Sequence, residues 1–432
     1  MEKVSNWGLS PLIEADVIEL QNYEDAARKI ASEKKLIARG NGRCYGDSSL
    51  QKTIVSTLRF NKIIAFDAEQ GIMKCESGVL LSEVLKVAVP KGFFLPVTPG
   101  TKFITIGGAV ASNIHGKHKS STFSQYVESF ELINEYGKIL FCSNETNAEI
   151  FRNTMGGMGL TGVIATVTFR LKKIETSFIN QKALKAENLD ELLDYFDKYK
   201  DYTYSVAWID CGTQGKAMGR SVLTVGEFAT LSELNEKQKK NPLETHSEKL
   251  INVPFMFPNF TLNKFTIQAF NFLYFHKQLK KEIDNIIHYN TFFYPLDILD
   301  NWNRIYGKNG FTQYQFVIPF ERGKEGLKKI MQRITQSGNG SFLAVLKTFG
   351  EAEILASPIS FPMAGYTLAL DFKITPNAMK LLDELDKLVL EYGGRLYLTK
   401  DSRMSKEMFE KTYTKFTHSE KFSSLQSERL SI

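Results

Sequence analysis

Cysteine is scarce in this sequence: there are four in 432 residues, far apart and never in a Cys-x-x-Cys arrangement. This spacing argues against a zinc site and a disulfide scaffold, and it favours a reducing compartment. The sequence also lacks an apolar run long enough to span a bilayer, and its N-terminus shows no apolar signal region. We therefore predict a cytoplasmic protein without a metal site, at most peripheral to a membrane.

Dense basic runs are absent as well. The net charge of +6 comes from 54 basic and 48 acidic residues and is spread thinly along the chain. No stretch of lysine and arginine is dense enough for a nucleic-acid footprint, so no nucleic-acid partner is expected. Repeats and low-complexity linkers are also missing. A content of 43% hydrophobic and 24% charged residues indicates a folded protein, and the length predicts two domains.

Local patterns predict an α+β fold. In the first part we expect strands at 36–39, 54–59, 63–67, 72–76, 129–134, 138–142 and 163–171, and helices at 24–35, 81–89 and 148–154. In the second part we expect strands at 202–210, 313–319, 342–348 and 367–372, and helices at 323–336 and 376–392. The second domain is predicted to carry an antiparallel sheet covered by helices on one side.

Glycine is concentrated in two short segments. Nearly all residues from Gly107 to Asn113 are small, and His115 and Lys117 follow directly. Small side chains let the backbone approach a large flat ligand and point its N–H groups at it. An earlier glycine turn carries Arg39 and Arg43, the kind of cation that a diphosphate requires. Glycines that only close turns are the alternative, but the two segments together predict one extended anionic cofactor, and we expect FAD.

A literal Gly-x-Gly-x-x-Gly motif begins at Gly157. A nicotinamide-binding turn places this motif after a strand and at the start of a helix. Here a predicted helix precedes the motif and a predicted strand follows it. We interpret it as a tight helix-to-strand connection that can still border a ligand.

His115 and Lys400 can each be interpreted as a structural residue or as a functional one. A lone histidine such as His115 is usually structural, but its place beside the small-residue segment favours a role at the ligand. Lys400 is by default a solvated lysine. The functional alternative is a cation that stabilises negative charge on a reduced flavin.

The stretch 253–276 is rich in phenylalanine. Buried packing in a strand or helix explains it most simply. The alternative is a mobile apolar flap that receives a lipid tail or touches a membrane. Pro254, Pro258 and Asn259 interrupt regular structure, which favours a loop.

With these residues in view, the chain resembles the vanillyl-alcohol-oxidase-type FAD flavoproteins. In the first part the resemblance rests on Ile37-Ala38-Arg39-Gly40, Tyr45-Gly46-Asp47, Pro99-Gly100-Thr101, Ile114-His115-Gly116-Lys117 and Gly159-Leu160-Thr161-Gly162. More specific matches in the second part are Phe257-Pro258-Asn259, Trp302-Asn303-Arg304, Gln313-Tyr314-Gln315-Phe316, Ser360-Phe361-Pro362, Gly393-Gly394-Arg395-Leu396-Tyr397 and Lys400-Asp401-Ser402-Arg403. These second-part segments are similar to the branch of the family that oxidises a polyprenyl-phosphate-linked ribose.

The resemblance implies a PCMH-type FAD-binding domain at 1–175, a substrate domain at 176–393 and a C-terminal return to the FAD-binding domain at 394–432. It implies FAD contacts from Arg39, Gly40, Asn41, Gly42, Arg43, Cys44, Tyr45, Gly46, Asp47, Ser48, Gly100, Thr105, Gly107, Gly108, Ser112, Asn113, His115, Ile164, Tyr397 and Lys400. Relatives that attach the flavin covalently use a histidine after the first glycine turn. Arg43 stands there, so non-covalent FAD is expected. Catalytic positions matched around the flavin ring and the sugar phosphate are Tyr45, Lys117, Gln315, Lys347 and Lys400.

The implied activity is oxidation of the ribose 2′-hydroxyl to the 2′-keto sugar by hydride transfer to flavin N5. This would be the first half of an epimerisation in cell-wall biosynthesis. The implied partners are a lipid-linked sugar phosphate, a separate NADH-dependent short-chain reductase, and a membrane surface contacted through 253–275.

Two alternatives to this activity stay open. One is an alditol or sugar-1,4-lactone oxidase acting on a soluble polyol, and the other is a flavin-fold protein without catalysis that serves as a membrane-associated binding partner. The chain also departs from the family in two places. Ala369 stands where mycobacterial relatives carry a cysteine, and the tail after Thr412 is shorter than in the family.

Overall fold

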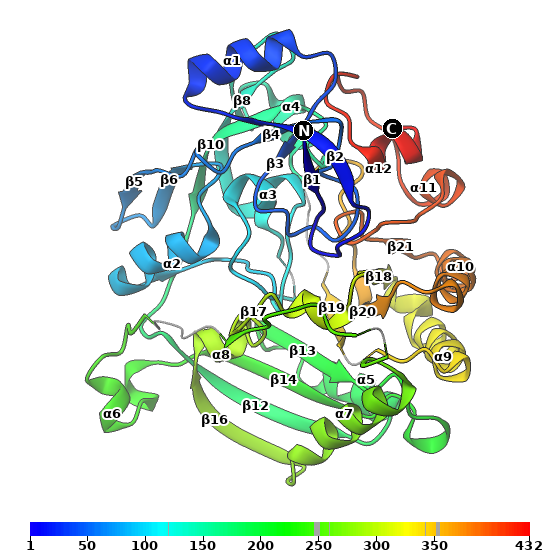
Figure 1. Cartoon of the computed structure of the whole chain (residues 1–432). Helices are drawn as coiled ribbons and strands as arrows, with labels where there is room; N and C mark the ends of the chain where they lie inside the picture. Colours follow the sequence, from blue (N-terminus) through cyan, green and yellow to red (C-terminus); the bar gives the residue numbers. More distant parts are fainter. Residues whose placement is uncertain (120, 246–250, 259, 342, 351–354) are drawn as a thin grey trace.

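The computed structural model describes residues 1–119, 121–245, 251–258, 260–341, 343–350 and 355–432 (Figure 1). Two sheets form the N-terminal part. A four-stranded sheet has the order β1 (Glu2–Val4), β2 (Ile13–Glu19), β4 (Thr53–Ser56), β3 (Ile37–Arg39). A five-stranded antiparallel sheet has the order β5 (Ile63–Asp67), β6 (Ile72–Glu76), β10 (Val163–Arg170), β8 (Val127–Ile133), β9 (Ile139–Ser143).

The helices of this part fill the space around the two sheets. They are α1 (Tyr23–Ser32), α2 (Leu81–Ala88), α3 (Ile106–Ala111) and α4 (Ala148–Thr154), with 3-10 turns η1 (Val89–Lys91) and η2 (Phe123–Tyr126) and a short pair of strands, β7 (Phe93–Phe94) and β11 (Lys172–Lys173). Ile30 of α1 packs in one apolar cluster with Val55 of the first sheet and Ile133 of the second. The small-residue segment forms α3, which begins where the Thr105 hydroxyl accepts a hydrogen bond from the Gly108 amide.

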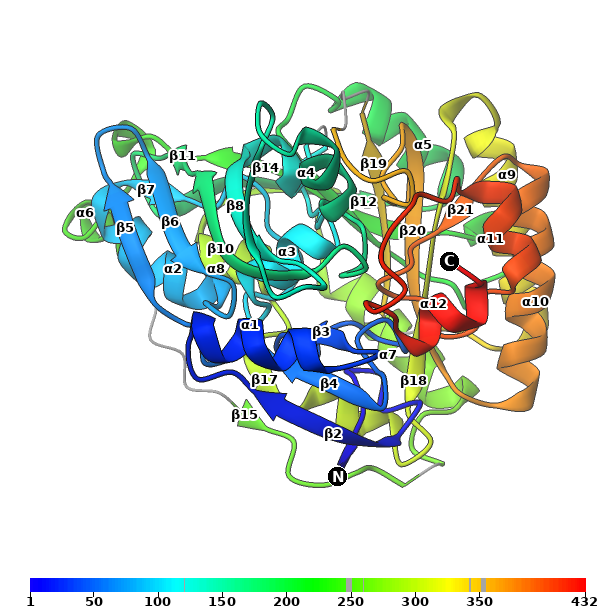
Figure 2. The ribbon, with the colours of Figure 1, turned by 90° about the horizontal axis from the view of Figure 1, so that it is seen from above.

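An eight-stranded antiparallel sheet dominates the second part. Its order is β16 (Glu282–His288), β12 (Phe178–Ala186), β14 (Ser221–Phe228), β13 (Tyr204–Ile209), β19 (Ala344–Phe349), β20 (Gly365–Lys373), β18 (Phe311–Ile318), β21 (Arg395–Leu396). The outer face is covered by α5 (Leu189–Lys198), α9 (Phe320–Ser337) and α10 (Pro376–Glu391). Figure 2 shows α9 and α10 on the side of the sheet that faces away from the N-terminal part.

Side chains alternate between the two faces of this sheet, as strand geometry requires. On β20, Leu368, Leu370 and Phe372 pack into the core under the helices. Ala369, between them, points to the opposite face and lines a cavity. The inner face of the sheet is therefore free to carry a site, while the outer face supplies the core.

The remaining helices and strands connect these sheets. They are α6 (Glu236–Lys239), α7 (Lys264–Lys277), α8 (Tyr289–Phe293), α11 (Lys406–Thr412), α12 (Leu425–Leu430), the parallel pair β15 (Ile251–Asn252) and β17 (Leu299–Asp300), and the 3-10 turns η3 (Gly215–Ala217), η4 (Leu231–Glu233) and η5 (Trp302–Tyr306). No helix among the described residues is long and apolar enough to cross a membrane.

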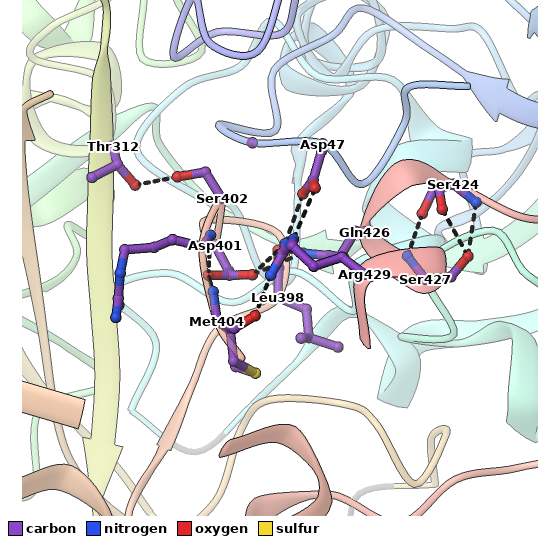
Figure 3. A network of polar contacts seen from close by, with 12 residues as sticks. Asp47, Thr312, Leu398, Asp401, Ser402, Met404, Ser424, Gln426, Ser427 and Arg429 are labelled. Carbon is purple, nitrogen blue, oxygen red and sulfur yellow. Dashed lines mark hydrogen bonds and ion pairs between the residues drawn. The ribbon is translucent and has the colours of Figure 1, made fainter. Parts of the chain in front are cut away.

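The C-terminal tail is attached to the N-terminal part by an ion-pair network (Figure 3). Arg429 of α12 forms a two-pronged pair with Asp47, at 2.9 and 3.1 Å, and a further contact of 2.9 Å with Asp401. The backbone amide of Leu36 donates to the Lys421 carbonyl at 2.8 Å. Residues near both ends of the chain thus share one polar network, and a domain division at 175 and 393 remains a prediction.

Several predicted elements are confirmed. The hairpin at 63–67 and 72–76 and the helix at 148–154 have the predicted bounds, and the Gly157 motif is the connection from α4 to β10. Gly159 has φ +80° there, a conformation that glycine tolerates.

The described residues around Pro254 and Pro258 lie in a loop, as the prolines predicted. The second half of the stretch is α7, which begins where the Asn263 side chain accepts hydrogen bonds from the amides of Phe265 and Thr266. The prediction of buried packing is wrong for most of this helix, since its aromatic side chains other than Phe275 are exposed. Asn259, and Phe342 of a predicted strand, lie outside the described residues. The strands β12, β14 and β16 and the helix α5 were not predicted. In β12 and β16, polar residues stand between the apolar ones, so their apolar alternation is weak.

Candidate active site

A cavity of about 960 Å³ opens between the N-terminal glycine segments and the inner face of the eight-stranded sheet. It has a size suited to a cofactor or a similarly large ligand. All five residues predicted to be catalytic line it: Tyr45, Lys117, Gln315, Lys347 and Lys400. The predicted cofactor contacts that line it are Gly40, Asn41, Gly42, Arg43, Cys44, Tyr45, Ser48, Gly100, Thr105, Gly107, Gly108, Ser112, His115, Ile164, Tyr397 and Lys400.

Four predicted cofactor contacts lie outside the cavity wall. The Arg39 guanidinium donates to the Ser5 carbonyl at 3.0 Å, which holds it toward the N-terminal strand. Asp47 pairs with Arg429. Gly46 and Asn113 also do not line the cavity.

Local contacts explain why Gly46 and Asn113 lie away from the cavity. A Cβ added to Gly46 would lie 2.0 Å from the Asp401 carbonyl oxygen, so the backbone there is pressed against the C-terminal segment. Asn113 is fully buried, donates to the Ser360 hydroxyl at 3.0 Å and accepts from the Ser124 amide at 3.0 Å. Both residues shape the loops that carry the site.

The N-terminal wall suits a long ligand with phosphate groups. The backbone amides from Gly40 to Cys44 donate to no acceptor within the described ranges. Ser77, which lines the cavity, has a buried hydroxyl without a hydrogen-bond partner among the described residues. A Cβ at Gly100 would meet nothing within 4 Å. Unused donors beside open space are what phosphate oxygens and a ring carbonyl require, so the residues present fit FAD.

A buried lysine–histidine pair stands at the inner end of the cavity. The Lys347 ammonium donates to Nδ1 of His115 at 2.8 Å and to the Gly116 carbonyl at 3.0 Å. Burial, helped by the neighbouring Lys400 and Lys117, lowers the pKa of Lys347 to about 7. Burial, and then the nearby Lys347 and Lys400, also lowers the pKa of His115 well below its usual value. His115 is therefore neutral, and Lys347 exchanges its proton near neutral pH.

Lys117 approaches the same space from the end of the small-residue segment. Its ammonium donates to the Phe292 carbonyl and lies 4.5 Å from the centroid of the Phe292 ring. Burial lowers the pKa of Lys117 to about 7. An anion that binds beside Lys117 would therefore draw a proton onto this lysine.

Lys400 faces Tyr45 across the cavity wall. Its Nζ lies 4.0 Å from the centroid of the Tyr45 ring. The Tyr45 hydroxyl accepts a hydrogen bond of 3.3 Å from Gln313, which also donates to Asp371 at 2.6 Å. Gln315 completes the wall, since its Nε2 lies 3.2 Å from the Thr367 hydroxyl and 3.5 Å from Nε2 of His115.

Sequence reasoning missed Gln313, Ser77 and the carboxyl of Asp371. Gln313 lies two residues before Gln315 on the same strand, so strand periodicity alone places both on one face. Asp371 likewise lies two residues after the cavity-lining Ala369 on β20. Ser77 carries no such signal, because it joins the site through packing against distant segments.

The outer part of the cavity is apolar. Trp208 of β13 lies against Tyr274 of α7, with ring centroids 4.5 Å apart, and Phe270 and Ile283 also line this part. A second cavity of about 600 Å³, between α7 and the end of α9, contains none of the predicted site residues. The main cavity thus joins a cationic inner end to an apolar mouth.

Comparisons with known proteins agree with this geometry. Residues 17–143 match the sequence profile of a family described as an FAD binding domain. A decaprenylphosphoryl-beta-D-ribose oxidase of Mycolicibacterium smegmatis is 35% identical over 95% of this chain and 91% of that protein. An uncharacterized protein of Streptomyces coelicolor is 27% identical over 78% of this chain and 92% of its own length. The L-gulonolactone oxidase of Mus musculus is 28% identical over 32% of this chain and 33% of that enzyme.

Proposed function

The chain belongs to the vanillyl-alcohol-oxidase-type FAD flavoproteins and is an FAD-dependent oxidoreductase, and we propose that it oxidises the 2′-hydroxyl of a polyprenyl-phosphate-linked ribose to the 2′-keto sugar. The observation that carries this proposal is the shape of the cavity. Three lysines surround its inner end, where a sugar phosphate would lie, and aromatic side chains of α7 line its mouth, where a lipid tail would leave. The similarity to a decaprenylphosphoryl-beta-D-ribose oxidase over nearly the whole chain supports the same substrate class.

The residues of the cavity have distinct roles in this proposal. Bound FAD supplies the acceptor for the hydride that leaves the sugar carbon. Lys117 binds the substrate phosphate, since a lysine with a pKa near 7 gains charge when an anion approaches. The buried Lys347–His115 pair accepts the hydroxyl proton, because Lys347 is partly neutral at pH 7. Lys400 holds positive charge where negative charge develops, and Gln315 orients the sugar through its neutral amide.

An anaerobic absorbance experiment tests the substrate class. Polyprenyl-phosphoribose added without oxygen is expected to bleach the flavin bands of the purified protein. Bleaching by free alditols or sugar lactones alone would instead favour the soluble-polyol oxidase. A protein that cannot be loaded with FAD would favour a binding function without catalysis.

We also propose that FAD is held without a covalent bond. Arg43 occupies the position at which relatives attach the flavin through a histidine, and its guanidinium lies 4.0 Å from the centroid of the Trp7 ring. Arginine offers no nucleophile for such a bond. Acid precipitation is therefore expected to release all of the flavin into the supernatant, measured by its absorbance against the native protein. Flavin that stays with the pellet and migrates with the denatured chain in gel fluorescence would contradict this.

The keto product needs a second enzyme if the net reaction is an epimerisation. We propose a separate NADH-dependent short-chain reductase as that partner, with the pair serving cell-wall biosynthesis. Adding such a reductase and NADH to the oxidation assay should convert the keto sugar into the epimeric alcohol.

Peripheral contact with a membrane through 253–275 is a further part of the proposal. Phe265, Leu273 and Phe272 of α7 are 79%, 68% and 53% exposed. The sequence from 251 to 281 contains four lysines and no acidic residue. Exposed aromatic and basic side chains together favour an anionic bilayer surface, and the cavity mouth beside α7 would open toward it.

Replacing both Phe265 and Leu273 by serine should lower the fraction bound to anionic phospholipid vesicles about tenfold or more. Each apolar side chain contributes about 1.5–3 kcal/mol when it leaves water. Co-sedimentation with vesicles measures the effect. Phe141→Ser is the matched control, since Phe141 is 51% exposed but lies on β9 of the five-stranded sheet and not on α7. Equal sedimentation of the α7 variant and the unaltered protein would exclude α7 as the contact.

A further inference from the structure

Asp371 is a buried carboxyl that lies behind the cavity wall and has no part in the roles described above. It sits on β20, two residues after Ala369, and is 2% exposed. One oxygen accepts a hydrogen bond of 2.6 Å from Gln313, and the other accepts one of 3.2 Å from the Tyr306 hydroxyl. Burying a carboxyl group without an ion pair is costly, so a retained one calls for a partner of opposite charge.

The cation that acts on it is Lys400, which reaches it through Gln313 and the Tyr45 ring and not through a direct ion pair among the described residues. Burial lowers the pKa of Lys400, and Asp371 opposes that shift; burial raises the pKa of Asp371, and Lys400 opposes it. Gln313 connects the carboxyl to Tyr45, whose ring lies under the Lys400 ammonium. The other titratable groups that interact with one member of the pair are Tyr45, Cys44, Tyr306, Lys347 and His115, while Lys117 acts on Lys347.

Asp371 sets the balance of charge among the three lysines at the inner end of the cavity. Lys347, Lys117 and Lys400 are three potential cations around one cavity, and like charges disfavour each other's protonation. Asp371 is the carboxylate that acts on Lys400, and it is not among the residues that line the cavity. Without it, Lys400 would lose its proton at lower pH than it does now.

We propose that Asp371 is a positioning residue that keeps Lys400 protonated and fixes the Gln313 amide against the Tyr45 hydroxyl. The assignment deepens the proposed function, since it concerns the lysine placed at the reacting end of the cavity. It does not depend on the identity of the sugar.

Asp371→Asn tests this inference, because asparagine keeps the shape and removes the charge. The pH at which Lys400 becomes reactive should fall by at least one unit, measured in the FAD-loaded protein by competitive acetylation with acetic anhydride and peptide mass spectrometry. The alkaline limb of the kcat profile should move to lower pH by the same amount, with little change in KM. The labelling needs no substrate, so its result stands even if the proposed substrate is wrong.

Two further variants keep the test decisive. Asp386→Asn removes a similarly buried carboxyl that serves Arg403 and Tyr314 on the outer side of the sheet, and it should leave the Lys400 profile unchanged. Tyr306→Phe weakens the stabilisation of the Asp371 carboxylate and should move the profile in the same direction by a smaller amount, which covers the case that Asp371→Asn fails to fold. An unchanged Lys400 labelling profile in Asp371→Asn, or in Tyr306→Phe if the first variant does not fold, would overturn the inference.

Discussion

Replacing Lys400 by alanine should leave the protein yellow and lower its turnover about 100- to 1,000-fold, the range seen when one preorganised electrostatic stabiliser is removed. Lys400 lines the cavity over the Tyr45 ring, and Asp371 opposes the effect of burial, which lowers the pKa of Lys400. The glycine segments that we propose to hold the rest of the flavin line the cavity independently of this lysine. Flavin content by absorbance and single-turnover rates with polyprenyl-phosphoribose measure the two effects separately.

The matched control for this experiment is Lys387→Ala. Lys387 is an exposed lysine of α10, on the outer side of the eight-stranded sheet. It should retain both flavin and full turnover. Full activity in Lys400→Ala would remove the lysine from the reaction and would favour a site organised around Lys347 and His115 alone.

Replacing Arg429 by alanine should destabilise the whole protein by about 3 kcal/mol or more, because it leaves two buried carboxylates without their counter-charge. Asp47 and Asp401 are each 6% exposed. Both contact the Arg429 guanidinium (Figure 3). Asp401 directly follows Lys400, so the loss should also loosen the turn that carries the lysine. The midpoint of thermal unfolding and the affinity for FAD both report the change.

An exposed ion pair provides the control. Lys324 contacts Asp197 at 3.0 Å, but both side chains are more than half exposed. Lys324→Ala should therefore shift the midpoint very little, since pairs in water contribute at most about 1 kcal/mol. Asp47→Asn combined with Arg429→Ala should recover part of the loss, since one uncompensated charge disappears. An Arg429→Ala midpoint equal to that of the unaltered protein would contradict the proposed role of this network.

Much of the candidate site could be predicted because it is contiguous in the chain. Gly40 to Tyr45 line the cavity as one turn, and His115 and Lys117 follow the small residues of α3 directly. Arg39 and Asp47 show the limit of this reasoning. Both are charged residues of the same turn, yet their side chains are taken by the N-terminal strand and by α12.

By itself, the sequence determined what depends on neighbouring residues: the strand and helix periods, the helix cap at Thr375, and the turns that need glycine. These follow from backbone geometry and hydrogen bonds within a few residues. Only the tertiary structure decided which partners meet across the chain. Asp47 and Arg429 are 382 positions apart, and Lys347 and His115 are 232 apart. Their contacts, and the pKa of each buried group, depend on packing that excludes water, which no local pattern records.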